Sequence, residues 1–241
     1  MRIRIKFRKW GVMKFVGHLD MMRYFQKAIR RANIDICYSE GFSPHQIMSF
    51  AAPLGVGITS DGEYFDIEVH SSLDTKSSIV ALNNQMVDGV EVTGYVLLSD
   101  RVPKAMAQVA AADYCLFYKE GYSSPFTKSE WQTRIEEYFL KADSFTISKK
   151  TKKSERVLDL KPLVYQFRLE GSENKPEFHL MVSTGSTDNI KPELVLTSIY
   201  QKMGISYDNN AIQIHKFETY SKEETTNQWI PLLDFGEEIV S

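Results

Sequence analysis

The chain has few cysteines, and their number excludes several classes of site. Only Cys37 and Cys115 occur among the 241 residues. Disulfide-stabilised folds need several paired cysteines, and a [4Fe–4S] cluster ordinarily needs three or four thiolates. Neither cysteine has a second Cys or a His at the spacing of zinc ligands. We therefore expect no metal site and no cofactor bound by this chain alone.

Long apolar segments are also absent. The longest apolar runs, such as residues 95–98, are far shorter than the roughly 20 residues that a membrane-spanning helix needs. The first residues, MRIRIKFRKW, alternate charged and apolar side chains and lack the apolar core of a signal peptide. The sequence therefore predicts a cytoplasmic protein with no membrane contact.

Net charge is small, but it is unevenly distributed along the chain. The whole sequence has a formal charge of −2, with 29 Lys and Arg against 31 Asp and Glu. Residues 1–50 nevertheless contain ten Lys or Arg and three acidic residues, a local charge of +7. Such a polarised charge is typical of a surface that binds a polyanion or an acidic partner.

The apolar periodicity predicts an α+β protein. Residues 2–8 alternate with a period of two, which indicates a strand with one apolar face and one entirely basic exposed face. From Leu19 to Ala32 the apolar residues recur every three or four positions, which indicates an amphipathic helix with Gly17 as its N-cap. The order of expected elements in the first hundred residues is β-α-β-β-α-β, the ferredoxin-like pattern, and the second half gives a similar series.

This series predicts two tandem ferredoxin-like (βαββαβ) sandwiches. We expect a basic ferredoxin-like domain over residues 1–100 and a second ferredoxin-like domain over residues 113–220. The acidic segment 221–241 shows little periodicity and is expected to be an extended C-terminal arm.

Two basic clusters are candidates for phosphate contacts. One is the polar side of the helix that begins near Gly17, and the other is the run SKKTKKSER. The cations expected to bind nucleic acid are Arg23, Lys27, Arg30, Arg31, Lys149, Lys150, Lys152 and Lys153. Neutralising phosphates releases counterions, which is the dominant source of nucleic-acid affinity, so we expect these cations to bind a nucleic acid, RNA before DNA. The alternative is that the basic side of the helix is only a solvated face.

A loop rich in turn residues, YSEGFSPH, follows the basic helix. The residues expected to form a specific pocket there are His18, Asp20, Ser39, Phe42 and His45. In the plain structural alternative, Phe42 is a core residue and His45 caps a carbonyl. His18 and His45 could instead act as an acid–base pair, or Asp20 as a nucleophile. Glu63 and Asp66 are expected to be solvated.

Several motifs carry a resemblance to a known family. They are FVGHLD at 15–20, RRA at 30–32, YSEGFSPH at 38–45, DLKP at 159–162 and KPE at 191–193. With these motifs the chain resembles the radical SAM-linked family of uncharacterised bacterial proteins, with Ser43 where Asn is usual and Gly17 where Ser is common. The resemblance implies a partner: a radical SAM protein with a cobalamin-binding-type domain, which would carry the [4Fe–4S] cluster and SAM.

We therefore expect an accessory protein that binds tRNA or rRNA and acts with a radical SAM RNA-modification enzyme. Two alternatives stay open. One is a metal-independent RNA-acting enzyme, similar to an endoribonuclease or a pseudouridine synthase. The other is a protein-interaction scaffold for the radical SAM partner.

Overall fold

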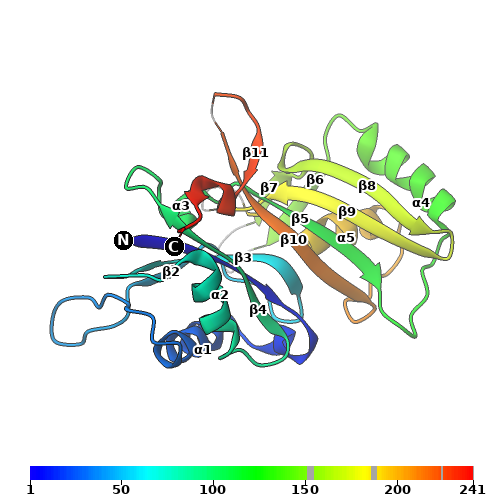
Figure 1. Ribbon diagram of the computed structural model, residues 1–241. Coiled ribbons are helices and arrows are strands. Elements are labelled where there is room, and N and C mark those ends of the chain that lie inside the picture. Colours follow the sequence, from blue (N-terminus) through cyan, green and yellow to red (C-terminus); the bar gives the residue numbers. More distant parts are fainter. Residues whose placement is uncertain (151–154, 186–188, 224, 241) are drawn as a thin grey trace. The chain divides into compact units, whose positions relative to one another are not determined.

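The computed structural model describes residues 1–150, 155–185, 189–223 and 225–240, and it confirms the α+β class (Figure 1). The chain divides into two compact units, each with its own apolar core. The first unit contains residues 1–111 and 216–241, and the second contains residues 112–215. Within the described ranges, no helix is both long enough and apolar enough to cross a bilayer.

The first unit begins with the predicted order of elements. They are β1 (Arg2–Lys9), the 3-10 turn η1 (Gly11–Phe15), α1 (His18–Arg31), β2 (Met48–Phe50), β3 (Thr59–Glu68), α2 (Thr75–Asn83), β4 (Val90–Leu98) and α3 (Ala105–Gln108). Strand β1 pairs antiparallel with both β3 and β4, and β2 pairs antiparallel with β3. The apolar side chains of β1 pack against α1 and α2 on one face of these strands.

The C-terminal segment completes the first unit, so the predicted acidic arm is wrong. It supplies part of β10 (Ile212–Lys222), then β11 (Trp229–Pro231), the 3-10 turn η4 (Leu232–Phe235) and β12 (Gly236–Glu237). Strand β12 pairs with β4, and Leu232 is fully buried beside Tyr64. The segment is acidic overall, but it contains apolar residues that pack in the first unit: Leu232 and Leu233 with Tyr64, and Ile239 against the core that includes α1.

The second unit contains its own set of strands and two main helices. Its elements are β5 (Ala111–Tyr118), α4 (Lys128–Ile135), the π-helical turn η2 (Glu136–Leu140), β6 (Thr146–Lys150), β7 (Glu155–Asp159), the 3-10 turn η3 (Lys161–Leu163), β8 (Val164–Ser172), β9 (Lys175–Ser183), α5 (Pro192–Lys202) and the start of β10. Here the strands lie in the order β10-β5-β9-β8, while β6 and β7 form a separate hairpin.

Two details of the predicted architecture differ in the structure. The apolar pattern of residues 158–170 predicts one continuous strand, but in the structure η3 separates β7 from β8 there, where Pro162 cannot donate a strand hydrogen bond. The first unit also takes strands from the C-terminal segment, so the expected domain limits of 1–100 and 113–220 are not the observed ones. The assignment of two tandem ferredoxin-like sandwiches is not confirmed and stays a prediction.

Candidate nucleic-acid interface

Helix α1 is positioned by its apolar side. Gly17 is its N-cap, as predicted, and the inward residues include Met21, Phe25 and Ile29, which are buried. The ring of Phe25 lies 4.7 Å from the ring of Phe7 on β1, within an aromatic cluster. This packing fixes the rotation of the helix about its own axis and turns its other side to solvent.

The solvent side of α1 is basic, and all four predicted cations on it are exposed. They are Arg23, Lys27, Arg30 and Arg31. Asp20 is also exposed, and its carboxylate lies 3.2 Å from the Arg23 guanidinium. Arg31 donates a hydrogen bond to the backbone carbonyl of Gln85. Exposed ion pairs of this kind are weak, so the helix keeps a cationic face.

Strand β1 does not have the entirely basic exposed face that the sequence predicts, so this expectation was wrong. Arg4 is completely buried, and its guanidinium makes two bonds to the Asp66 carboxylate, at 2.8 and 3.0 Å. The other ion pairs of the strand join Lys6 to Glu218 at 2.5 Å and Arg8 to Asp61 at 2.7 Å and to Glu91 at 3.3 Å. Residues of α3 and η4 cover Arg4, since Ala105 donates to Asp66 and Leu232 accepts from Arg4.

The SEGFSPH loop is closed by Ser39 and His45. The Ser39 hydroxyl lies 2.8 Å from Nδ1 of His45, and the two backbones are joined by a hydrogen bond from Ser39 N–H to the His45 carbonyl. The side-chain amide of Gln46 donates to the carbonyl of Gln26 on α1. The C-terminal end of the loop is therefore joined to the basic helix by a hydrogen bond from Gln46.

A hollow of about 290 Å³ lies behind this loop, against β2 and β3. Its polar lining consists of Arg2, Ser39, His45, Ser49, Asp66, Glu68 and Lys104. Charges of both signs meet there, so the hollow is not a simple anion site. Apolar side chains of Ile47, Met48 and Ile67 also line it, so the hollow combines an apolar wall with hydrogen-bonding groups that could orient a ligand.

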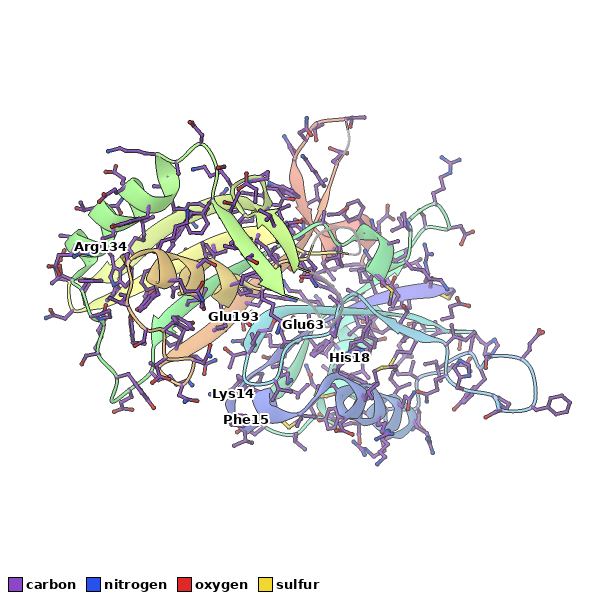
Figure 2. The ribbon with its side chains drawn as sticks, turned by 180° about the vertical axis from the view of Figure 1, so that it is seen from behind. Lys14, Phe15, His18, Glu63, Arg134 and Glu193 are labelled. Carbon is purple, nitrogen blue, oxygen red and sulfur yellow. The ribbon has the colours of Figure 1, made fainter. Side chains whose placement is uncertain are left out.

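The predicted five-residue pocket is not formed as a single site. Of the five predicted residues, only Ser39 and His45 line the hollow behind the loop. Asp20 points to solvent, and Phe42 is fully exposed, so Phe42 is not a core residue. His18, labelled in Figure 2, lines a different, smaller hollow. Its ring packs edge-on against Phe50 with the ring centroids 5.3 Å apart. The structure therefore does not bring His18 and His45 together as an acid–base pair.

A buried charged cluster lies at the hollow of His18. Glu63 is only 3% exposed, so its expected solvation was wrong, as it was for Asp66 at 4%. The Glu63 carboxylate contacts the Lys216 ammonium at 2.5 Å and the Ser60 hydroxyl at 2.8 Å. Lys9 lines the same hollow, and burial lowers the pKa of its ammonium, while the charge of Glu63 opposes that shift.

Sequence reasoning missed this cluster, although one signal for it was present. Lys9 occupies the apolar phase of β1, two residues after Phe7, so it points to the side of the sheet that carries the core. A lysine at that phase must be neutralised or hydrogen-bonded. Its ammonium donates to the carbonyl of Val16, at 2.6 Å, just before the start of α1.

The second basic cluster cannot be placed in the same way. Lys149 and Lys150 belong to β6, in the second unit, and Lys152 and Lys153 lie outside the described residues. Their contribution to nucleic-acid binding stays a prediction. A further group, Cys115 with Glu177 and His179, brings metal-ligating atoms together within the second unit.

Comparisons with known proteins give a family but no activity. Residues 2–192 match the model of a family described as "uncharacterized protein conserved in bacteria (DUF2344)". No curated protein matches the sequence. Among solved structures, a chain of a Cbf5-Nop10-Gar1 complex is 12% identical with a TM-score of 0.48, and the match covers 92% of this chain and 51% of that one. An unknown protein from Galdieria sulphuraria is 9% identical with a TM-score of 0.24, over 89% of this chain and 96% of that one. The chain thus spans about half the length of the matched chain from the Cbf5-Nop10-Gar1 complex.

Proposed function

Because the chain belongs to this uncharacterized bacterial family, which brings no activity with it, we propose a function from the surface of the first unit. The protein binds RNA, tRNA or rRNA, and acts as an accessory protein to a radical SAM enzyme that modifies this RNA. The observation that carries the RNA part is the exposure of four cations on one side of α1.

The spacing of these cations suits a phosphate backbone. From Arg23 to Arg31 the helix rises by about 12 Å, at roughly 1.5 Å per residue. Successive phosphates of one strand are spaced by only about 3.4 Å along a duplex axis, so the basic face can contact more than one of them. Such contacts give affinity and orientation but carry no base specificity.

Specificity is assigned to the loop that is anchored on the same helix. Phe42 is fully exposed, and an exposed aromatic ring is a stacking platform for an unpaired base. Ser39 and His45 beside it offer hydrogen-bonding groups. Unpaired bases are typical of RNA loops, which is why RNA is favoured over duplex DNA.

The radical SAM part of the proposal rests on the sequence resemblance. The enzyme partner would supply the [4Fe–4S] cluster and SAM, because a cluster ordinarily needs more thiolates than this chain has. The role of this chain is then to bind the RNA and present it to the partner.

A double charge reversal on α1 tests RNA binding. Arg30→Glu with Arg31→Glu is expected to weaken RNA affinity at least about tenfold at moderate salt and to make it less dependent on salt, since phosphate contacts are lost. The measurement is fluorescence anisotropy with labelled tRNA over a series of salt concentrations. The matched control is Lys76→Glu with Lys175→Glu, which changes net charge equally at two exposed lysines that do not belong to α1. Equal affinities of the two double variants would refute the proposal.

Co-purification tests the partner. The radical SAM protein is expected to co-purify with the wild-type chain, and nuclease treatment is expected to reduce the yield if RNA bridges the two proteins. A complex that resists nuclease, together with no binding of RNA alone, would favour the scaffold alternative. RNA cleavage or isomerisation by the purified chain, abolished by His18→Ala, His45→Ala or Asp20→Ala, would favour the enzyme alternative.

A further inference from the structure

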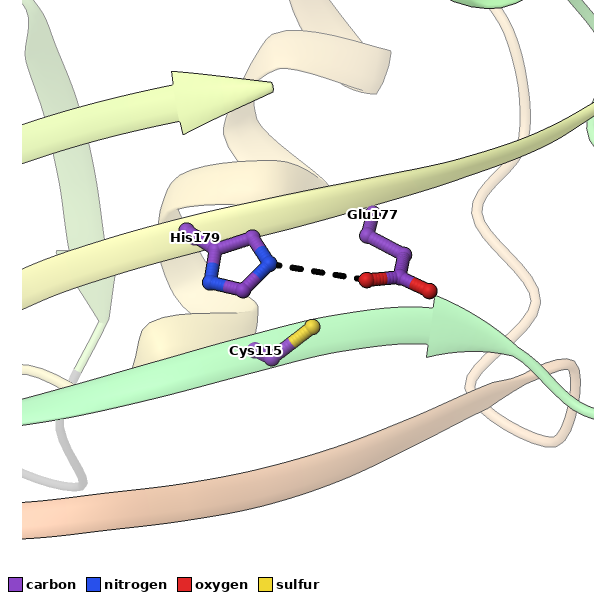
Figure 3. A group of neighbouring side chains, drawn as sticks. All are labelled: Cys115, Glu177 and His179. Carbon is purple, nitrogen blue, oxygen red and sulfur yellow. Dashed lines mark ion pairs between the residues drawn. The ribbon is translucent and has the colours of Figure 1, made fainter. Parts of the chain in front are cut away.

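Three side chains of the second unit gather metal-ligating atoms on one face of its sheet. Glu177 and His179 are two residues apart on β9, so both point to the same side, and Cys115 lies on the neighbouring strand β5. Figure 3 shows the three side chains facing one another. Each side chain contributes one potential ligand atom: the Cys115 sulfur, a His179 ring nitrogen and a Glu177 oxygen. These three atoms lie within 4.8 Å of one another.

The cluster is on the side of the sheet away from the helices. Phe178 and Leu180, which alternate with these residues along β9, are buried in the core with Trp131 of α4 and Ile199 of α5. The cluster residues therefore are not part of that core. Cys115 is 4% exposed and the side chain of His179 is 15% exposed, whereas the side chain of Glu177 is 46% exposed. A small ion can thus reach the group from the Glu177 side.

We propose that Cys115, Glu177 and His179 form a binding site for a thiophilic divalent transition metal, with Zn²⁺ as the expected ion. Thiolate, imidazole and carboxylate are the three side-chain groups that Zn²⁺ takes as ligands. Metal–ligand bonds of about 2.0–2.3 Å in a tetrahedral site place two ligand atoms about 3.3–3.7 Å apart. Nε2 of His179 and a Glu177 oxygen are already 3.6 Å apart.

A second carboxylate, that of Glu170, lies beside His179 but outside the group of three. Glu170 on β8 lies opposite Glu177 in the strand register, and one of its oxygens is 3.7 Å from Nε2 of His179. The Arg168 guanidinium lies 3.6 Å from the other oxygen. Glu170 is the candidate fourth ligand, and a metal ion would neutralise the two facing carboxylates.

The electrostatics of the cluster favour a cation. The carboxylates of Glu177 and Glu170 lie 3.6 and 3.7 Å from Nε2 of His179, and their negative charge attracts a cation. A divalent ion would screen the two carboxylates from each other and take Cys115 as a thiolate ligand. An ordinary ion pair between a protonated His179 and these glutamates is the competing explanation.

Metal loading distinguishes the two explanations. The purified chain is incubated with Zn²⁺ or Co²⁺, excess ion is removed by gel filtration, and bound metal is measured by mass spectrometry. We expect one ion per chain and, with Co²⁺, a sulfur-to-cobalt charge-transfer band together with the visible bands of a tetrahedral ion. Wild-type protein that holds no metal after this treatment would overturn the proposal.

Variants identify the ligands. Cys115→Ser is expected to lose the charge-transfer band and to weaken metal binding by more than about 100-fold, since changes even outside the ligand shell cost 10–100-fold. Cys37→Ser, in the first unit, is the matched control and is expected to bind the metal as the wild type does. Glu177→Gln, at a half-exposed side chain, is expected to weaken binding while leaving the circular dichroism spectrum unchanged. Unchanged binding in both Cys115→Ser and Glu177→Gln, or loss of the band in Cys37→Ser, would place the ion elsewhere and refute the site.

Discussion

The substitution Asp66→Ala is expected to lower the free energy of unfolding of the first unit by about 3–5 kcal/mol, the cost of breaking a buried ion pair. Arg4 is completely buried and Asp66 is 4% exposed, and two hydrogen bonds join them. Removing the carboxylate leaves the guanidinium uncompensated. It also removes the acceptor for the backbone N–H of Ala105.

Urea denaturation and hydrogen exchange of peptides from the first unit would measure this effect. The matched control is Asp61→Ala, which breaks the ion pair with Arg8, where both side chains are about two-fifths exposed. The control is expected to cost less than about 1 kcal/mol. Replacing both members of the buried pair, as Arg4→Met with Asp66→Leu, is expected to recover most of the loss. Equal losses for Asp66→Ala and Asp61→Ala would contradict the structure.

Trp131→Ala is expected to destabilise the second unit by about 3–5 kcal/mol, as for other large core residues. The indole is fully buried, and its ring lies about 5 Å from the rings of Phe126, Phe178 and Tyr200. Its N–H also donates to the Ser124 hydroxyl at 2.8 Å. The substitution therefore removes both a large packed volume and a hydrogen bond.

Hydrogen exchange resolved by peptide is the measurement, because the two units have separate cores. Protection is expected to fall in β5, β9 and α5 and to change little in β1 and β4. Trp131→Phe is the control: it keeps an aromatic ring, loses the N–H, and is expected to cost clearly less than the alanine. A loss of protection spread equally over both units would show that their cores are not independent.

The parts of the fold that depend on local patterns could be predicted from the sequence. The spacing of apolar residues over residues 2–8 and 19–32 predicts β1 and α1, and it shows which side of α1 is basic. Glu63 and Asp66 could not be placed correctly, because their neutralising partners are remote in sequence. Asp66 pairs with Arg4, 62 residues away, and Glu63 pairs with Lys216 of the C-terminal segment.

The candidate sites also divide into a part formed by residues near one another in sequence, which could be predicted, and a part formed by residues remote in sequence, which could not. Contact between Ser39 and His45 is local, and the sequence placed these two residues together. The group around Cys115 joins two strands that are remote in sequence, so no spacing rule could detect it. The available sign was the spacing of Glu177 and His179, which are two residues apart in the apolar run that forms β9 and therefore place two ligand types on one face.

The return of the chain to the first unit after residue 215 has a consequence for its synthesis. At about 5–20 residues per second, the second unit takes about 5–20 s to emerge before Lys216 appears. During that interval Glu63 has no Lys216, and both Lys6 and Tyr64 lack Glu218. The unit whose synthesis begins first is therefore completed only after the second unit has been synthesised, and α1 belongs to an incomplete unit until the residues after 215 have emerged.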